Sequence, residues 1–264
     1  MIQFDNIPNA RELGGIHTRD GRRVRDGLLL RSAYLVHASD ADIARLSEEY
    51  HISKVLDLRT GYECRRSPDR PVPGASNVNI EILSLNGHLY RGMSKFFPEG
   101  VSFEGGMAGF CMSPAAEMLC DGFYASFVSD PECQESYANF FRELLSSEGP
   151  VLWHCTQGKD RTGLAAAFLL YVLGAEEKDI HADFLESNVS YADDIAGVKA
   201  CVTQMGGTQV NLECVQTLVG VSDRSFLEAM DWIGSHCGGM DEYIKNQLHL
   251  SEADVLELRR RYLV

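Results

Sequence analysis

One short segment of the chain concentrates side chains that can act as a nucleophile or bind an anion. It begins at Cys155, ends at Gly163 and reads C-T-Q-G-K-D-R-T-G. An apolar run typical of a strand precedes it, and an Ala/Leu-rich run typical of a helix follows. Strand, tight loop and helix in this order allow the loop amides and the positive end of the helix to face one point. The segment therefore predicts an anion-binding cradle with a thiol at its base.

Most positions of this loop have a candidate role. Cys155 is the candidate nucleophile, because a helix N-terminus and nearby cations favour the thiolate form of a cysteine. Arg161 carries a planar guanidinium that can hold two oxygens of a phosphoryl group at once. Thr162 can donate its hydroxyl to the sulfur, and Gly158 permits a backbone conformation that residues with a Cβ avoid. The residues expected to bind the anion are Thr156, Gln157, Gly158, Lys159, Asp160 and Arg161.

Three other uses of Cys155 fit the sequence less well. A Cys-His protease pair with His154 is geometrically poor, since neighbours on a strand point to opposite faces. A nucleotide-binding Walker loop needs a glycine five residues before Gly158, where Trp153 stands. A structural cysteine beside a chance arginine does not explain why two glycines, a lysine, an arginine and a threonine all fall where a phosphate cradle needs them.

The spacing Cys155-x5-Arg161-Thr162 resembles the signature of the cysteine-dependent protein tyrosine phosphatase superfamily. The longer string H-C-x-x-G-K-D-R-T-G resembles a bacterial subgroup of it. The resemblance implies a two-step reaction without a metal or cofactor, in which the thiolate takes the phosphoryl group and water then hydrolyses the phosphocysteine. It implies phosphotyrosine as the main substrate, with phosphoserine, phosphothreonine or phosphoinositides as further candidates. Other segments resemble the subgroup in the same order along nearly the whole chain: Asn9–Gly15, Leu30–Ser32, Val55–Arg59, Asp183–Asn188 and Tyr243–Leu263.

Such a reaction needs a carboxylic acid to protonate the leaving oxygen, a role worth about 10² to 10⁴ in rate. The chain has no Trp-Pro-Asp string, so the acid is an open choice among three aspartates. Asp57 is our first choice, because it ends a predicted strand and matches the subgroup's D-L-R aspartate, to which the acid role is attributed. Asp160 lies inside the loop, where pairing with a cation would favour a positioning role. Asp69 is the third candidate.

Three further residues bear on substrate choice. Lys159 adds a second charge to the loop, which would help to bind substrates with more than one phosphate; the alternative is a lysine that points to solvent. Of the arginines that could surround the site, Arg59 is the one expected to touch substrate. Gln157 stands where the subgroup usually has a small residue such as alanine, so the preference among substrates is open.

The pattern of apolar residues predicts an α/β fold with a central, mainly parallel sheet flanked by helices. All of residues 1–264 are expected to form a single domain, with a mainly helical half at 162–264. Residues 86–110 are rich in glycine and aromatic residues without a sustained period, and predict a flap-like insertion, either a mobile lid or an irregular surface segment. Strands are expected at 28–30, 54–58, 78–82 and 151–153. Helices are expected at 41–50, 135–145, 162–173, 177–187, 210–219, 223–236 and 251–261.

Composition and charge exclude several classes of protein. The chain has 24 basic and 38 acidic residues, a net charge of −14, which disfavours nucleic-acid binding and diffuse binding to anionic membrane. Its longest uncharged run, 162–175, is too short to span a bilayer, and its first residues do not resemble a cleavable export signal. The eight cysteines contain no C-x-x-C pair, so a reduced, cytoplasmic protein without a zinc site is expected, although secretion without a cleavable signal stays open.

The expected function is therefore a phosphatase that acts on phosphorylated protein or phosphoinositide. Two rivals stay open. A rhodanese-type sulfurtransferase also places a cysteine under loop amides, although the Cys-x5-Arg-Thr spacing argues against it. A phosphate-binding module could keep the cradle and lack the acid, although Cys155 and Arg161 are both present. The sequence leaves the physiological substrate and the oligomeric state undetermined.

Overall fold

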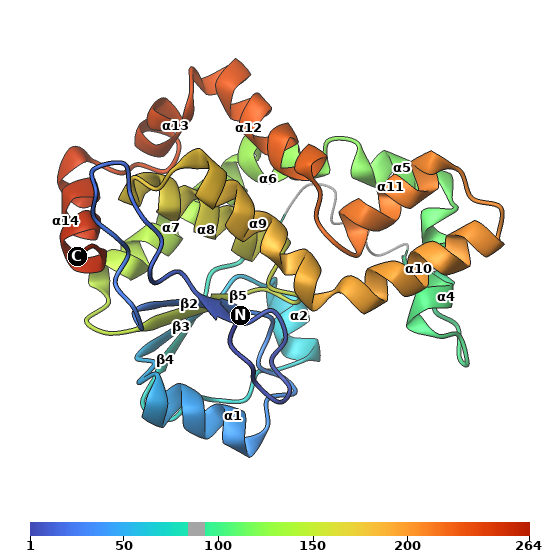
Figure 1. Cartoon of the computed structure of the whole chain (residues 1–264), viewed down its shortest axis with the longest axis horizontal. Coiled ribbons are helices and arrows are strands. Elements are labelled where there is room, and N and C mark those ends of the chain that lie inside the picture. Colours follow the sequence, from blue (N-terminus) through green and yellow to red (C-terminus); the bar gives the residue numbers. More distant parts are fainter. Residues whose placement is uncertain (84–92) are drawn as a thin grey trace.

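The computed structural model describes residues 1–83 and 93–264. In this part of the chain, five strands form one sheet in the order β1-β2-β5-β3-β4 (Figure 1). Neighbouring strands are parallel except for β1, which runs antiparallel to β2. The mainly parallel sheet that the sequence predicted is thus confirmed. The strands are β1 (Arg11–Glu12), β2 (Leu29–Ser32), β3 (Lys54–Asp57), β4 (Ser76–Asn79) and β5 (Val151–His154).

One strand is displaced from its predicted position. We expected residues 78–82, but the edge strand β4 ends at Asn79. Ile80 and Ile82 follow it, are buried in the core, and donate their amides to the carbonyls of Asp57 at 2.8 Å and Leu58 at 3.4 Å, although the last strand pair is that of Asn79 with Asp57. An apolar pattern indicates that side chains are buried, and residues beyond the end of a strand can be buried as well. For this reason the end of the strand was predicted too far along the chain.

Alternation along the strands sends side chains to two separate cores. Leu30, Leu152 and Val55 stand side by side across β2, β5 and β3 and pack in the smaller core, toward α1 (Asp40–Ala44). Leu56 and Trp153 point to the opposite face and pack in the larger core, toward α7 (Pro131–Ser146) and α8 (Asp160–Leu173). Figure 1 shows α1 on one side of the sheet and α7 and α8 on the other.

The periodic segments of the sequence form helices as predicted. Besides α7 and α8, these are α9 (Glu177–Ser190), α11 (Gln209–Leu218), α12 (Asp223–Cys237) and α14 (Glu252–Tyr262). The segment predicted as one helix at 41–50 forms α1 followed by a π-helical stretch, η1 (Arg45–Glu49). Shorter or weakly amphipathic helices were not predicted: α2 (Gly61–Arg66), α5 (Pro114–Cys120), α6 (Phe123–Ser129), α10 (Ala192–Gln204) and α13 (Met240–Asn246).

The predicted flap-like insertion lies only partly within the described residues, since 86–92 fall outside them. The rest of it contains a 3-10 turn, η2 (Met93–Phe96), and a helix, α4 (Phe103–Cys111). Met107 and Phe110 of α4 are buried, and α4 packs against α10. The end of this segment is therefore a packed helix, not irregular chain, because its small residues allow close contact between helices. Movement of the segment as a lid stays a prediction.

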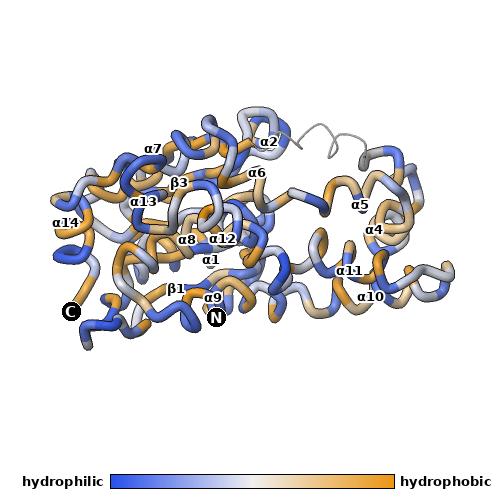
Figure 2. The backbone as a smooth tube through the Cα atoms, turned by 90° about the horizontal axis from the view of Figure 1, so that it is seen from above, coloured by the Kyte–Doolittle hydropathy of each residue, from blue (hydrophilic) through white to orange (hydrophobic). Residues whose placement is uncertain are grey.

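Four helices form a lobe that extends sideways from the sheet. Figures 1 and 2 both show α4, α5, α10 and α11 grouped at one end of the molecule. We call these four helices the helical lobe. No described helix is both long and apolar enough to cross a membrane. All eight cysteines lie in the described residues as free thiols, and five of them are buried.

Candidate active site

The loop from Cys155 to Lys159 connects the carboxyl end of β5 to the start of α8. Its carbonyl groups are turned outward, where neighbouring segments donate hydrogen bonds to them. The carbonyl oxygen of Thr156 accepts from the Tyr34 amide at 3.2 Å. The carbonyl oxygen of Gln157 accepts from Asn9 Nδ2 at 3.1 Å and from the Tyr191 hydroxyl at 2.6 Å. The carbonyl oxygen of Gly158 accepts from Asn9 Nδ2 and from the Arg31 guanidinium, both at 2.9 Å.

This outward arrangement of carbonyls determines where the amides point. In each trans peptide the C=O and N–H bonds point in opposite directions, so the amides that follow these carbonyls face the inside of the loop. Cys155 lies at the base of the loop with 2% of its surface exposed. The loop ends at the N-terminus of α8. The loop is therefore built as the anion cradle that its sequence predicted.

Gly158 is required in this loop for two separate reasons. Its φ angle is +66°, in the left-handed region that favours glycine. A Cβ at this position would also lie 2.2 Å from the carbonyl oxygen of Ser32, at the end of the neighbouring strand β2. The loop can approach β2 this closely only because residue 158 has no side chain.

Arg161 is held by a residue that the sequence analysis did not select. Glu63 of α2 accepts hydrogen bonds from both terminal nitrogens of the Arg161 guanidinium, at 2.8 and 2.9 Å. Glu63 Oε1 also accepts from the Thr156 hydroxyl at 2.7 Å. Burial acts to raise the pKa of Glu63, but its hydrogen bonds and charge interaction with Arg161 hold that pKa well below the usual range. A carboxylate thus orients both the arginine and the first hydroxyl of the cradle.

A local sequence signal could have identified Glu63. Thr60 and Glu63 form a capping box that begins α2: the Thr60 hydroxyl accepts from the Glu63 amide, and Glu63 Oε2 accepts from the Thr60 amide at 2.9 Å. The pattern Thr-x-x-Glu directly after a predicted strand predicts such a helix start. It places Glu63 near the carboxyl edge of β3, the same edge at which the cradle lies.

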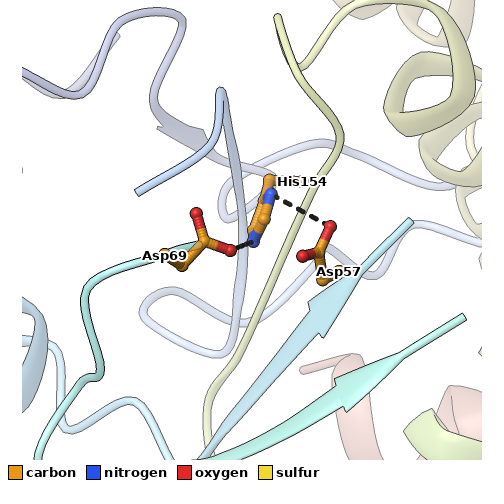
Figure 3. A group of neighbouring side chains, drawn as sticks. All are labelled: Asp57, Asp69 and His154. Atoms are coloured by element: carbon orange, nitrogen blue, oxygen red, sulfur yellow. Dashed lines mark ion pairs between the residues drawn. The ribbon is translucent and has the colours of Figure 1, made fainter. Parts of the chain in front are cut away.

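Asp57 and Arg59, both predicted as site residues, belong to a buried charge cluster with Asp69 and His154. Figure 3 shows the two aspartates on either side of the His154 ring. Arg59 donates to both oxygens of Asp57, at 2.9 and 2.7 Å, and to Asp69 Oδ2 at 2.6 Å. Nε2 of His154 lies 3.2 Å from Asp69 and its Nδ1 lies 3.7 Å from Asp57. Since Asp57 pairs in register with His154, both side chains lie on the α1 face of the sheet.

The cluster corrects the role expected for Arg59 and keeps the Asp57 carboxyl group ionised. Burial acts to raise the pKa of Asp57, but the hydrogen bonds from Arg59 and the charge of His154 lower it to about 2. A carboxyl group that stays ionised cannot donate a proton. The Arg59 guanidinium is fully buried and bonded to two carboxylates, so it is not available to a substrate. Asp57, Asp69 and His154 offer ligand atoms within 4.8 Å of one another, but Arg59 is the cation that both carboxylates bind.

The other two arginines considered for the site are also committed inside the protein. Arg11 and Arg31 both donate to Asp183 on α9, the former at 2.8 Å. Arg31 in addition donates to the carbonyl of Gly158. These contacts brace the outer side of the cradle against α9.

The last loop residues differ in how well they match their predicted roles. Asp160 begins α8 and accepts a short hydrogen bond from the Tyr124 hydroxyl of α6, with 13% of its side chain exposed. Lys159 faces neither a phosphate nor solvent: it is fully buried, and its ammonium donates to the carbonyls of Leu218 at 2.7 Å and Gly220 at 2.9 Å. Both roles considered for Lys159 are therefore wrong, because its side chain runs through the interior to the end of α11.

Thr162 and Gln157 complete the loop. Thr162 is fully buried, and its hydroxyl has no hydrogen-bond partner within the described part of the chain. The predicted bond from this hydroxyl to the nucleophilic sulfur is therefore not formed in this structure, and it stays a prediction. Gln157 is half-buried at the tip of the loop, and its backbone carbonyl is bonded to Asn9 and Tyr191.

Comparison with known proteins agrees with this geometry. The chain is 34% identical over 265 residues to a protein of Cupriavidus necator named as a tyrosine-protein phosphatase, covering 99% of this chain and 88% of the relative. It is 27% identical over 255 residues to the triple specificity protein phosphatase PtpB of Mycobacterium tuberculosis, covering 89% and 91%. A tyrosine-protein phosphatase of Nostoc commune is 26% identical over 238 residues, covering 88% and 73%.

A family model agrees with these relatives over almost the full length. The model of the tyrosine phosphatase family matches residues 2–264, a range that contains the cradle, Glu63 and the charge cluster behind them. With a thiol under inward-facing amides and an arginine at the start of α8, this chain belongs to the tyrosine phosphatase family.

Proposed function

We propose that this phosphatase hydrolyses phosphotyrosine in proteins through a phosphocysteine on Cys155, with Asp160 as the proton donor and acceptor. The observation that carries the proposal is the loop whose carbonyls are all bonded outward, because its amides then converge above Cys155. Arg161 adds a guanidinium already oriented by Glu63. Such preorganised donors stabilise the charge that develops on a phosphoryl group during transfer.

Two displacements at phosphorus make up the proposed reaction. In the first, the Cys155 thiolate attacks phosphorus, the S–P bond forms, the P–O bond to tyrosine breaks, and Asp160 gives its proton to the leaving phenolate oxygen. In the second, water attacks the phosphocysteine, Asp160 accepts the proton of that water, and the S–P bond breaks with release of inorganic phosphate. In this second step we expect the Thr162 hydroxyl, which has no other partner in the described residues, to donate to the departing sulfur.

Asp160 is proposed as the acid because it is the aspartate that the cradle itself presents. Its carboxylate begins α8 next to Arg161 and stays partly exposed, so a leaving group can reach it. Asp57 and Asp69, by contrast, both bind the buried Arg59 and lie in the cluster around His154. The sequence favoured Asp57 because it ends a strand at the ligand-binding edge, but its side chain is on the face that packs toward α1.

The contacts of Lys159 narrow the proposed substrate class. The Lys159 ammonium is bonded to the end of α11 and therefore does not reach a bound substrate. In the described part of the cradle, Arg161 is then the charged donor, and it serves one phosphoryl group. This favours phosphotyrosine, with phosphoserine and phosphothreonine as secondary substrates, over phosphoinositides that carry several phosphates. The name of the mycobacterial relative, which states triple specificity, supports testing all three classes.

The test compares three variants on aryl phosphates with good and poor leaving groups. Cys155→Ser should abolish turnover, and activity equal to that of the natural chain would end the proposal. Asp160→Asn should slow the poor leaving group by about 10² or more and the good one much less, because only the poor one needs protonation. Asp57→Asn is the matched control, and a larger effect there than at Asp160 would return the acid role to Asp57.

The two rival functions are checked in the same preparation. A rhodanese-type sulfurtransferase would transfer sulfur from thiosulfate to cyanide, and we expect no such activity. A phosphate-binding module would bind phosphopeptide without releasing inorganic phosphate.

The free thiols throughout the described chain support our further proposal that the enzyme works in a reducing compartment such as the cytoplasm.

A further inference from the structure

Lys159 is a buried cation with an unusual set of partners. It is the N-cap residue of α8 and has no exposed surface. Its ammonium donates to the carbonyl of Leu218, the last residue of α11, and to that of Gly220 just beyond it. The C-terminal end of a helix carries partial negative charge, which suits a cation. The side chain thus joins the phosphate cradle to the helical lobe.

The turn that receives Lys159 is itself held in place. Asn188 of α9 binds Val221 twice, accepting from its amide at 2.9 Å and donating to its carbonyl at 3.0 Å. Gln216 donates to the same carbonyl at 3.0 Å. At Gly220, an added Cβ would lie 2.6 Å from Asn188 Oδ1. The two carbonyls that Lys159 binds therefore have a defined position with little freedom to shift.

The charged surroundings of Lys159 include the proposed acid. Lys159 Nζ lies 3.9 Å from Asp160 Oδ1. The other titratable groups that act on this ammonium are the thiols of Cys155 in the cradle, Cys120 on α5 and Cys111 on α4, and burial lowers its pKa. Asp160 is also bonded to Tyr124 of α6 and interacts electrostatically with Arg161 and Tyr191.

We propose that Lys159 is a positioning residue, which fixes the cradle to the helical lobe and places a cation against Asp160, and that it does not bind substrate. The inference rests on the proposed role of Asp160. Because its ammonium is bonded to the end of α11 and lies 3.9 Å from Asp160 Oδ1, Lys159 fixes where the Asp160 carboxylate stands beside the cradle.

The test compares aryl phosphates with a poor and a good leaving group, measured on Lys159→Met, Lys159→Arg and Gly220→Ala. Lys159→Met should lower kcat for the poor leaving group by about tenfold or more and for the good one much less, with KM unchanged, because only the poor one needs a well-placed acid. Lys159→Arg keeps the cation and should restore most of this selective loss. Gly220→Ala displaces the receiving turn without changing any charge, and should cause a selective loss in the same direction.

The outcomes separate this inference from the proposed function. Equal losses for the two leaving groups in Lys159→Met would overturn the inference, and so would a rise of KM alone, which would show that Lys159 binds substrate. If Lys159→Met does not fold, as judged by its thermal transition, the decision rests on Lys159→Arg and Gly220→Ala, where an equal loss for both leaving groups in Gly220→Ala contradicts it. Asp160→Asn is run alongside: a loss that does not depend on the leaving group there shows that the acid is elsewhere, which rejects the proposed role of Asp160 itself.

Discussion

Replacing Glu63 by glutamine should weaken the orientation of the cradle arginine while leaving Arg161 itself in place. Glu63 binds both terminal nitrogens of Arg161 at 2.8 and 2.9 Å and the Thr156 hydroxyl at 2.7 Å. A glutamine has nearly the same shape but carries one oxygen and one NH₂ group. It can accept only one of the two bonds from the guanidinium, and its NH₂ group then faces another donor.

The size of the effect follows from the bond that is lost. A hydrogen bond to a charged group is worth about 1.5–3 kcal/mol, so the orientation that Glu63 maintains should lose about 2 kcal/mol. Arg161 would then adopt the competent orientation about thirtyfold less often, and kcat/KM should fall by that factor. The remaining N–H groups of Arg161 stay available to a phosphate in both proteins, so the loss reports orientation and not removal of the contact.

The assay is release of inorganic phosphate from a phosphotyrosine peptide, with thermal unfolding measured alongside. Glu49→Gln is the matched control, since it also breaks an Arg–Glu ion pair, the exposed pair with Arg45 at 3.0 Å, and should leave kcat/KM unchanged. An unchanged kcat/KM in Glu63→Gln would refute the reasoning, and an increase would show instead that Glu63 competes with the substrate for Arg161.

Three further predictions follow from the same contacts. Because the pKa of Asp57 is depressed to about 2, its contribution to stability is present above about pH 4 and is lost as the pH falls through about 2. Asp57→Asn should therefore lower the free energy of unfolding by about 2 kcal/mol at pH 7 and by much less near pH 2. Urea unfolding at the two pH values measures this difference. Gly158→Ala should abolish phosphate release, because the new methyl group would collide with Ser32 and open the loop; full activity with an unchanged thermal transition would contradict this. Phosphoinositide hydrolysis should be at least about tenfold less efficient than phosphotyrosine hydrolysis in a phosphate-release assay, because Lys159 does not face the cradle.

The cradle and the class of fold could be predicted because both depend on residues close together in the chain. The loop from Cys155 to Arg161 is seven consecutive positions between a strand and a helix, so its spacing alone brings thiol, amides and guanidinium to one point. The periodic helices and the buried strands likewise follow from local patterns of apolar residues. The end of β4 was predicted too far along the chain, because Ile80 and Ile82 are buried in the core although they lie beyond the strand.

The partners of the long charged side chains were decided only by the tertiary structure. Glu63 meets Arg161 across 98 residues of sequence, through the short helix α2 that the apolar pattern did not predict. Lys159 turns to the end of α11, and Arg59 to the two aspartates beside His154. A lysine or arginine side chain reaches several ångströms in many rotamers, and which acceptor it finds depends on what the fold packs around it. The sequence therefore determined the chemistry of the cradle, whereas packing decided which charges serve it.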